Sequence, residues 1–269
     1  GTVVVTSVGN PLQFAPAEDL DSSPRDPGGD LAGLTRTLTG VDGALSVGQR
    51  VVFAPTPEVI YPAGQPAVRI DPGPIATVLE GRTRPTHFAG VCQVVLTLMH
   101  LTAPRWALFG RKDAQQLAII ESMVRDLAVP LEIVPVDIRR ESDGLAMSSR
   151  NAYLSPDQRR QALALSRALQ AGRDAAAQGA GSGARPGPAD IRRAALASLE
   201  EADGVEVDYV ALVAPDSFED LAGAGLGLPR SAPAGEDEGE GLPAVGLLAV
   251  AARVGTTRLI DNTLIDLRP

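Results

Sequence analysis

A short segment in the middle of the chain combines several groups that bind anions. Residues 147–150, Met-Ser-Ser-Arg, place two hydroxyls and a guanidinium side by side, shortly after a glycine turn at Gly144. Lys112, further upstream, is the only lysine among the 24 basic residues of the chain. A compact ammonium, a guanidinium and hydroxyl donors together suit a polyphosphate. The plainer alternative is a polar loop with a helix cap, preceded by a solvated helix start.

The elements that would carry these residues alternate between strand and helix in the first half of the chain. Apolar, β-branched runs predict strands at 2–8, 50–55, 105–110 and 131–138. Helical patterns fall between them, namely a weak helix near 30–38, a helix at 87–101 capped by Thr86, and a helix at 112–128 with a buried stripe that ends at Leu127. This order predicts an α/β fold with a mostly parallel sheet and helices on both faces.

The pattern changes after residue 139. Ser155-Pro156-Asp157-Gln158 has the residues of a capping box with proline in the first turn, and predicts a helix that extends to about residue 177. A flexible link, a second helix at 189–202 and three apolar strands follow, and the strands predict a small sheet. We therefore expect two domains, 1–138 and 139–269.

Parallel strands bring distant loops together. Ligands of open α/β sheets bind beyond the carboxyl ends of the strands. Asn10 and Gln13 follow the first strand, Lys112 and Asp113 follow the third, and residues 148–150 follow the fourth, so all should lie at one edge. Lys112 also opens a helix, whose free N–H groups favour an anion. Each residue taken alone also has a structural explanation: Asn10-Pro11 is a common turn pair, and Asp113 favours the helix dipole regardless of any ligand.

Composition limits the possible partners. The net charge is −9, which argues against nucleic acid and anionic membrane surfaces. No apolar run approaches the roughly 20 residues of a membrane-spanning helix, and no secretory signal is recognisable. Cys92 is the only cysteine, so the chain can form neither an intrachain disulfide nor a cysteine zinc cluster, and we expect a cytoplasmic protein. The chain begins at Gly1 inside an apolar run, from which we expect that its natural start is missing.

Six segments, in this order, resemble the pantoate–β-alanine ligase (pantothenate synthetase) family. They are NPLQF, YP, LEGRTRPTHFAGV, FGRKDAQQL, DGLAMSSRNAYLS and ARVGTTRLIDN, and they extend over nearly the whole chain. The resemblance implies a Rossmann-like nucleotidyltransferase domain, a smaller α+β C-terminal lid-like domain and a homodimer. It implies that ATP and pantoate form an enzyme-bound pantoyl adenylate, which β-alanine converts to pantothenate with release of AMP. Mg²⁺ would accompany the ATP.

The same resemblance assigns roles to individual residues. Ser148, Ser149 and Arg150, in a loop that begins at Met147, would clamp the phosphates, and Lys112 would contact the phosphates and the reacting carboxylate. The nucleotide-binding residues would be Gly110, Arg111, Lys112 and Asp113, with the Ile138 backbone at the adenine. The pantoate-binding residues would be Asn10, Gln13, His87 and Gln116.

The chain departs from the family pattern at several places, among them Ser23, where the family usually has a tyrosine. The family carries a His-x-Gly-His motif after its first strand, and neither His87 nor His100 lies in such a motif. Arg111 occupies the position of a usual glutamate, and a usual acidic cluster is reduced to Asp30, so no metal ligand is predicted. Two alternatives remain open at this point: a non-catalytic relative that binds pantoate or nucleotide, and a ligase of this type for another hydroxy acid.

Overall fold

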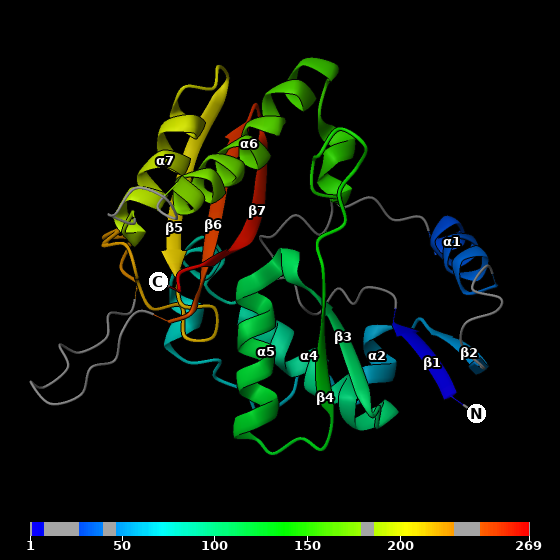
Figure 1. The fold of residues 1–269 in the computed structure, drawn as a ribbon. Coiled ribbons are helices and arrows are strands. Elements are labelled where there is room, and N and C mark those ends of the chain that lie inside the picture. Colours follow the sequence, from blue (N-terminus) through cyan, green and yellow to red (C-terminus); the bar gives the residue numbers. More distant parts are fainter. Residues whose placement is uncertain (1, 8–26, 40–46, 179–185, 229–242, 269) are drawn as a thin grey trace, which may run out of the picture. The chain divides into compact units, whose positions relative to one another are not determined.

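The computed structural model describes residues 2–7, 27–39, 47–178, 186–228 and 243–268 (Figure 1). The chain divides into two compact units, one of residues 1–72 and 84–105, the other of residues 73–83 and 106–269. The predicted domain boundary after residue 138 stays a prediction. Among the described helices, none combines the length and apolar character that crossing a membrane would require.

The first unit contains a parallel strand pair and two longer helices. β1 (Thr2–Ser7) pairs with β2 (Val47–Phe53), with Val5 opposite Val51, and α1 (Pro27–Thr39) lies between them in the sequence. The short α2 (Pro57–Ile60) and the long α4 (His87–Thr102) complete this unit.

Helix α4 was predicted to begin with a cap at Thr86, and this detail is wrong. Thr86 has helical backbone angles, φ −101° and ψ −7°, and its side chain makes no capping hydrogen bond. A capping side chain needs an extended backbone to reach the free N–H groups, so Thr86 cannot serve. Cys92 in the middle of α4 is fully buried, and burial raises the pKa of its thiol to about 11.

The second unit begins with a strand–helix–strand element. β3 (Trp106–Gly110) and β4 (Glu132–Val136) are parallel, and they are connected by the 3₁₀ turn η3 (Arg111–Asp113) and helix α5 (Ala114–Asp126). The parallel pairing and the intervening helices agree with the predicted α/β class, although β1–β2 and β3–β4 form separate two-stranded sheets among the described residues. Leu127 lies beyond the end of α5 and is 54% exposed, so the predicted buried stripe ends one turn earlier.

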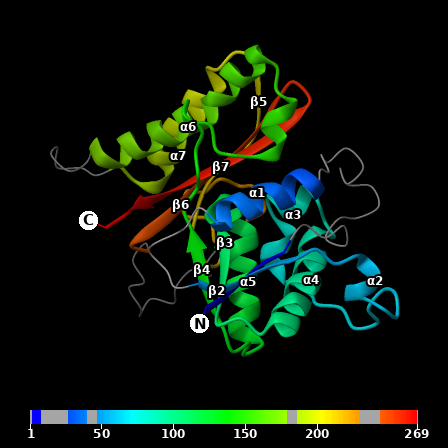
Figure 2. The same ribbon diagram turned by 90° about the vertical axis from the view of Figure 1, so that its right-hand side faces the viewer.

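The second unit also contains an antiparallel sheet in the order β5–β6–β7, with β5 at Val205–Val213, β6 at Val245–Val254 and β7 at Thr257–Asp266. Because side chains alternate along a strand, the sheet presents two apolar faces. Val210, Leu248 and their face neighbours pack with helices α6 (Pro156–Gln178) and α7 (Pro188–Glu200), which lie side by side in Figure 2. Ala211, Ala249 and the rest of the other face pack with α5 and with the segment that carries η2 (Pro74–Thr77) and α3 (Glu80–Thr83).

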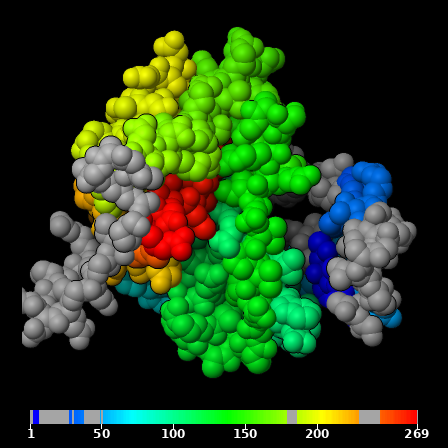
Figure 3. Space-filling view, in the orientation of Figure 1, coloured from blue at the N-terminus to red at the C-terminus, as the bar shows by residue number. Residues whose placement is uncertain are grey.

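Helix α6 begins as the sequence predicts. The Ser155 hydroxyl accepts a hydrogen bond from the Gln158 N–H at 3.2 Å, and the Gln158 side chain accepts from the Ser155 N–H at 3.0 Å. These two bonds form a complete capping box. In Figure 3 the end of β7, in red, reaches the surface beside helices α6 and α7.

Candidate anion-binding site

The turn that carries Lys112 lies where β3 ends and α5 begins. Gly110 is extended, residues 111–113 form η3, and the free N–H groups of the α5 start follow directly. Lys112 is half-buried, and no ion pair joins it to any of the described residues, whereas neighbouring Arg111 pairs with Asp137 at 3.2 Å. The ammonium of Lys112 is therefore available for an anion at a helix N-terminus, an environment that already favours negative charge.

The two glutamines after this turn differ in burial. Gln115 is buried and donates to the carbonyls of Ile75 and Val78 at 2.6 and 2.8 Å, while it accepts from the Glu80 N–H at 3.1 Å. Its amide therefore links α5 to the 73–83 segment, and the role of Gln115 is structural. Gln116 is only half-buried, and its assignment to pantoate stays a prediction.

A tight hairpin precedes the Ser-Ser-Arg segment. Arg140 and Ala146 form an antiparallel bridge, and the Met147 N–H donates to the Arg139 carbonyl at 2.9 Å. Gly144 closes the turn with φ 95°, a backbone conformation that favours glycine. Leu145 and Ala146 are buried, and Leu145 belongs to the core on the α6 face of the sheet. The hairpin is thus anchored by the apolar residues of its returning strand, and it fixes where residue 147 leaves the core.

Helix α6 holds the hairpin by charge. Arg159 contacts Glu141 at 2.7 Å and Asp143 at 2.8 Å. The pKa of Glu141 is lowered by its hydrogen bond from Asn151 and then by Arg159, and the pKa of Asp143 is lowered by the Leu145 N–H and then by Arg159. Both carboxylates therefore stay ionised and paired at neutral pH.

The Ser-Ser-Arg segment itself exposes its polar groups. Ser148 is extended, and its hydroxyl accepts from the Arg150 N–H at 3.2 Å, at the start of the 3₁₀ turn η4 (Ser149–Tyr153). Ser149 and Arg150 are exposed, and Arg150 makes no ion pair with the described residues. Asn151 is buried and donates to Glu141 at 2.7 Å and to the Ala146 carbonyl at 3.0 Å. Asn151 therefore anchors the segment to the hairpin, while the two residues before it, Ser149 and Arg150, are exposed to solvent.

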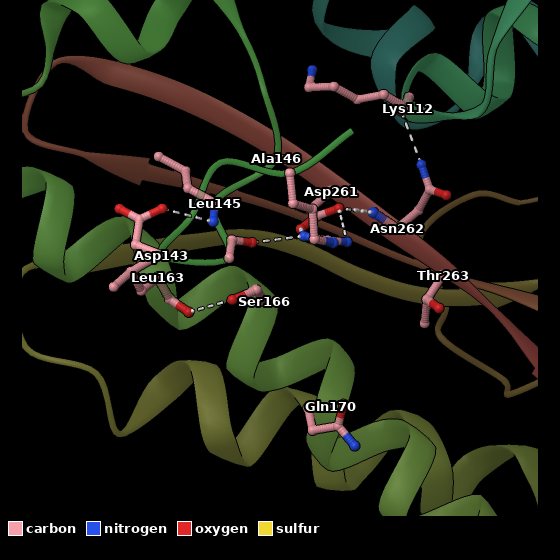
Figure 4. A network of polar contacts seen from close by, with 12 residues as sticks. Lys112, Asp143, Leu145, Ala146, Leu163, Ser166, Gln170, Asp261, Asn262 and Thr263 are labelled. Atoms are coloured by element: carbon pink, nitrogen blue, oxygen red, sulfur yellow. Dashed lines mark hydrogen bonds and ion pairs between the residues drawn. The ribbon is translucent and has the colours of Figure 1, made fainter. Parts of the chain in front are cut away.

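One pair of neighbouring residues on β7 contacts both of these loops. The Asn262 side chain donates to the carbonyls of Arg111 and Lys112, both at 2.9 Å. The Asp261 carboxylate accepts two bonds from Arg140, at 2.7 and 3.0 Å. Figure 4 shows Asn262 directed at the Lys112 backbone, with the Lys112 side chain extending away from it. The structure thus brings the lysine turn and the base of the hairpin to one strand.

A second polar cluster on β7 was not predicted. Arg258 donates to both oxygens of Glu80 at 2.6 and 2.7 Å and to Asp208 at 2.7 Å, and the Tyr209 hydroxyl donates to Glu80 at 3.0 Å. Burial and the charge of Glu80 raise the pKa of Tyr209 well above its ordinary value. Burial alone would lower the pKa of Arg258, but the hydrogen bonds and charges of Glu80 and Asp208 outweigh it and raise that pKa. The sequence offered one sign of this cluster, namely the charged residues Asp208 and Arg258 within otherwise apolar strands.

The predicted site residues fall into three groups. Asn10 and Gln13 lie outside the described residues. His87 belongs to the other unit, where it is buried and its ring lies 5.2 Å from that of Phe88. The second unit contains all the others, namely Gly110, Arg111, Lys112, Asp113, Gln116, Ile138, Met147, Ser148, Ser149 and Arg150. In the part of the chain that the structure describes, no three His, Cys, Asp or Glu side chains are grouped to hold a metal ion.

Comparison with known proteins gives consistent matches. Residues 1–264 match the family described as Pantoate-beta-alanine ligase. Pantothenate synthetase 4 of Frankia alni is 49% identical over 260 residues, which are 97% of this chain and 72% of that protein. A crystal structure of pantothenate synthetase from Thermus thermophilus is 39% identical, with a TM-score of 0.79 over 99% of this chain and 84% of the other. A pantoate-beta-alanine ligase structure from Francisella tularensis, complexed with beta-gamma ATP and beta-alanine, is 26% identical, with a TM-score of 0.63 over 97% of this chain and 79% of the other.

Proposed function

Because the chain belongs to the pantoate–β-alanine ligase family, we propose that its Lys112 turn and its Ser148–Arg150 segment together bind the phosphates of ATP. The known reaction of the family is the ATP-dependent condensation of pantoate with β-alanine, and the chain is a ligase of this kind. The observation that supports the proposed site is that the Lys112 turn and the hairpin preceding residues 148–150 both contact adjacent residues of β7.

The first chemical step requires charge compensation. The pantoate carboxylate must approach the α-phosphate of ATP, although both carry negative charge. Its oxygen forms the new bond to phosphorus while pyrophosphate leaves with the electron pair of the broken P–O bond. The Lys112 ammonium, the Ser148 and Ser149 hydroxyls and the Arg150 guanidinium would offset this repulsion and the charge that grows on pyrophosphate.

The second step needs a different environment. The neutral amine of β-alanine attacks the acyl carbon of the adenylate, a C–N bond forms, and AMP leaves with the former bridging oxygen. The amine nitrogen gives up a proton to complete the amide. Water competes for the same acyl carbon, so the bound adenylate must be shielded from solvent.

The remaining residues receive their roles as proposals from the family resemblance. For the nucleotide we propose Gly110, Arg111, Asp113, the Ile138 backbone and Met147. For pantoate we propose the amides of Gln13 and Gln116 together with Asn10 and His87. Gln116 is half-buried, which leaves its amide accessible to a ligand and supports its part in this assignment.

Mg²⁺ is proposed to enter as the counter-ion of ATP. Among the described residues, no three His, Cys, Asp or Glu side chains are grouped to hold a metal ion, and we propose that the phosphates of ATP hold it. Magnesium commonly keeps several waters and binds through substrate phosphates, which agrees with this view.

We further propose a cytoplasmic homodimer. The single, buried cysteine is compatible with a reducing compartment. Light scattering coupled to size-exclusion chromatography tests the dimer, and cell fractionation tests the location. A monomer at micromolar concentration would contradict the first proposal, and recovery outside the cytoplasm would contradict the second.

The reaction is tested by following its two halves separately, in the protein with any coding sequence that lies upstream of Gly1. We expect exchange of labelled pyrophosphate into ATP that depends on pantoate, and AMP formation that depends on both pantoate and β-alanine. Exchange with related hydroxy acids but not with pantoate would indicate a different acid substrate. Tight ATP binding without either half-reaction would indicate a non-catalytic relative.

A further inference from the structure

Two neighbouring side chains of β7 point to opposite faces of the sheet and reach different loops. Asp261 and Asn262 are 3% and 6% exposed, so both are nearly inaccessible to solvent. Successive residues of a strand face opposite sides, and Asn262 accordingly reaches η3 while Asp261 reaches the hairpin base. A buried polar side chain that makes specific hydrogen bonds fixes the orientation of its partners.

Asn262 controls the orientation of the lysine turn. Its amide nitrogen has two hydrogens, and one is available for each of the two carbonyls that it contacts, those of Arg111 and Lys112. Two successive peptide planes are therefore directed at one atom. Because the planes on either side of a residue determine where its Cα–Cβ bond points, this contact sets the direction in which the Lys112 side chain leaves the backbone.

Asp261 controls the base of the hairpin in the same way. Its two oxygens accept from Arg140, and one of them also accepts from the Asn262 N–H at 2.8 Å. Arg140 in turn donates to the Gly144 carbonyl at 3.1 Å and so crosses the hairpin. A bidentate arginine–carboxylate pair is both strong and directional. The contact fixes the hairpin from which residues 148–150 extend.

We propose that Asp261 and Asn262 are positioning residues of the ligase, which together set the placement of the Lys112 ammonium and of the Ser148–Arg150 donors. This inference rests on the proposed phosphate-binding roles of those residues. Both side chains are nearly inaccessible to solvent and are bound to protein partners. Their effect on the reaction passes through the two loops, and a misplacement of about 1 Å at a reacting centre reduces the rate on the order of 100-fold.

The test uses Asn262→Asp, which keeps the size of the side chain but replaces the two donors with a carboxylate that repels the two carbonyls. We expect kcat of pantoate-dependent pyrophosphate exchange to fall roughly 30- to 100-fold. Asn262→Ala removes the donors without adding charge, and we expect a loss of about tenfold. Thr263→Ala is the matched control on the same strand, and its kcat should stay within about twofold.

A double-variant cycle separates positioning from general damage to the fold. If Asn262 acts through Lys112, then Asn262→Ala should lower kcat by less than about twofold in a Lys112→Ala background. A purely structural effect would reduce the amount of folded enzyme equally in both backgrounds. The corresponding cycle for the other loop pairs Asp261→Asn with Ser149→Ala, and we expect the same non-additivity.

The outcomes distinguish this inference from the proposed function. Near-normal exchange by Asn262→Asp and Asn262→Ala, while Lys112→Ala loses roughly 1000-fold, would overturn the positioning role and leave the phosphate site intact. Fully additive losses in both cycles would also overturn it. Normal exchange by Lys112→Ala would instead contradict the proposed site. Should Asn262→Asp fail to fold, the Asn262→Ala cycle decides the question.

Discussion

Strand β7 carries two polar regions that use charge in opposite ways. Around Arg258, a half-buried guanidinium donates from all three of its nitrogens to the carboxylates of Glu80 and Asp208, and Glu80 also accepts from the Tyr209 hydroxyl. Near Asp261 and Asn262, buried polar groups hold two loops whose cations, Lys112 and Arg150, make no ion pair within the described residues. In the first region the charged side chains pair with one another and join segments of the chain. In the second region Lys112 and Arg150 stay available for an anionic ligand.

The difference indicates how a stable site can retain unpaired cations. Three carboxylates of the second region already have a cationic partner: Glu141 and Asp143 are paired with Arg159, and Asp261 is paired with Arg140. Because these carboxylates are already paired, they are not free to form ion pairs with Lys112 or Arg150. It follows that substitutions in the two regions should affect different measurements, and the following experiments test this.

The largest expected effect is on catalysis, from Lys112→Ala. Adenylate formation should fall roughly 1000-fold, the scale of losing a preorganised electrostatic donor, and the melting temperature should be unchanged because no ion pair is lost. Lys112→Arg should restore little, since a planar fork does not replace a compact ammonium. Pyrophosphate exchange and differential scanning calorimetry measure the two effects. A drop of several degrees in melting temperature would place Lys112 with the structural charges.

The next effect is on stability, from Arg258→Met. Removal of the guanidinium leaves Glu80 and Asp208 without their partner, and the free energy of unfolding should fall by about 3 kcal/mol. The melting temperature should fall by about 8 °C, while kcat of the folded enzyme is retained.

Glu80→Gln in the Arg258→Met background provides the control. It removes one orphaned charge, so the double variant should be more stable than Arg258→Met alone. If the double variant is instead less stable, the carboxylate is not the source of the loss.

A smaller effect on stability is expected from the start of α6. Ser155→Ala removes the acceptor for the Gln158 N–H and should lower the free energy of unfolding by about 1 kcal/mol, measured by urea denaturation. Ser155→Thr keeps a hydroxyl and should lose much less. Equal losses in both variants would argue against the capping bond as the cause.

The smallest effect concerns pH. The pKa values of Glu141 and Asp143 are lowered in the folded protein, so their pairing stabilises the fold above their ordinary pKa values and the stabilisation disappears as pH falls. Arg159→Gln should therefore lower the melting temperature at pH 7, and the difference from the unmodified protein should shrink below about pH 4. A difference that stays constant down to pH 3 would show that Arg159 stabilises the hairpin by packing rather than by charge.

Local patterns in the sequence were sufficient to predict much of the fold. The β-branched runs gave the strands, and the Ser155–Gln158 box gave the start of α6, because each depends on residues close in sequence. Thr86 was misjudged because a capping residue is defined by its backbone angles, which its identity does not reveal.

The site was only partly predictable. The anion-binding residues stood out by type and spacing, since lysine is rare in this chain and serine pairs are conspicuous beside arginine. The role of Asn262 did not, because its partners are backbone carbonyls about 150 positions away and carry no signature in the sequence. The contact between Arg258 and Glu80 spans 178 positions and was invisible for the same reason.

The burial of Cys92 has a practical consequence. A thiol that is fully enclosed and whose pKa is raised to about 11 reacts slowly with maleimides at neutral pH. A single cysteine introduced at exposed Ala152, just beyond the Ser-Ser-Arg segment, would then carry a fluorophore almost alone. Because native Cys92 would take up little label, the fluorescence would come almost entirely from position 152 and would report on movement of this loop.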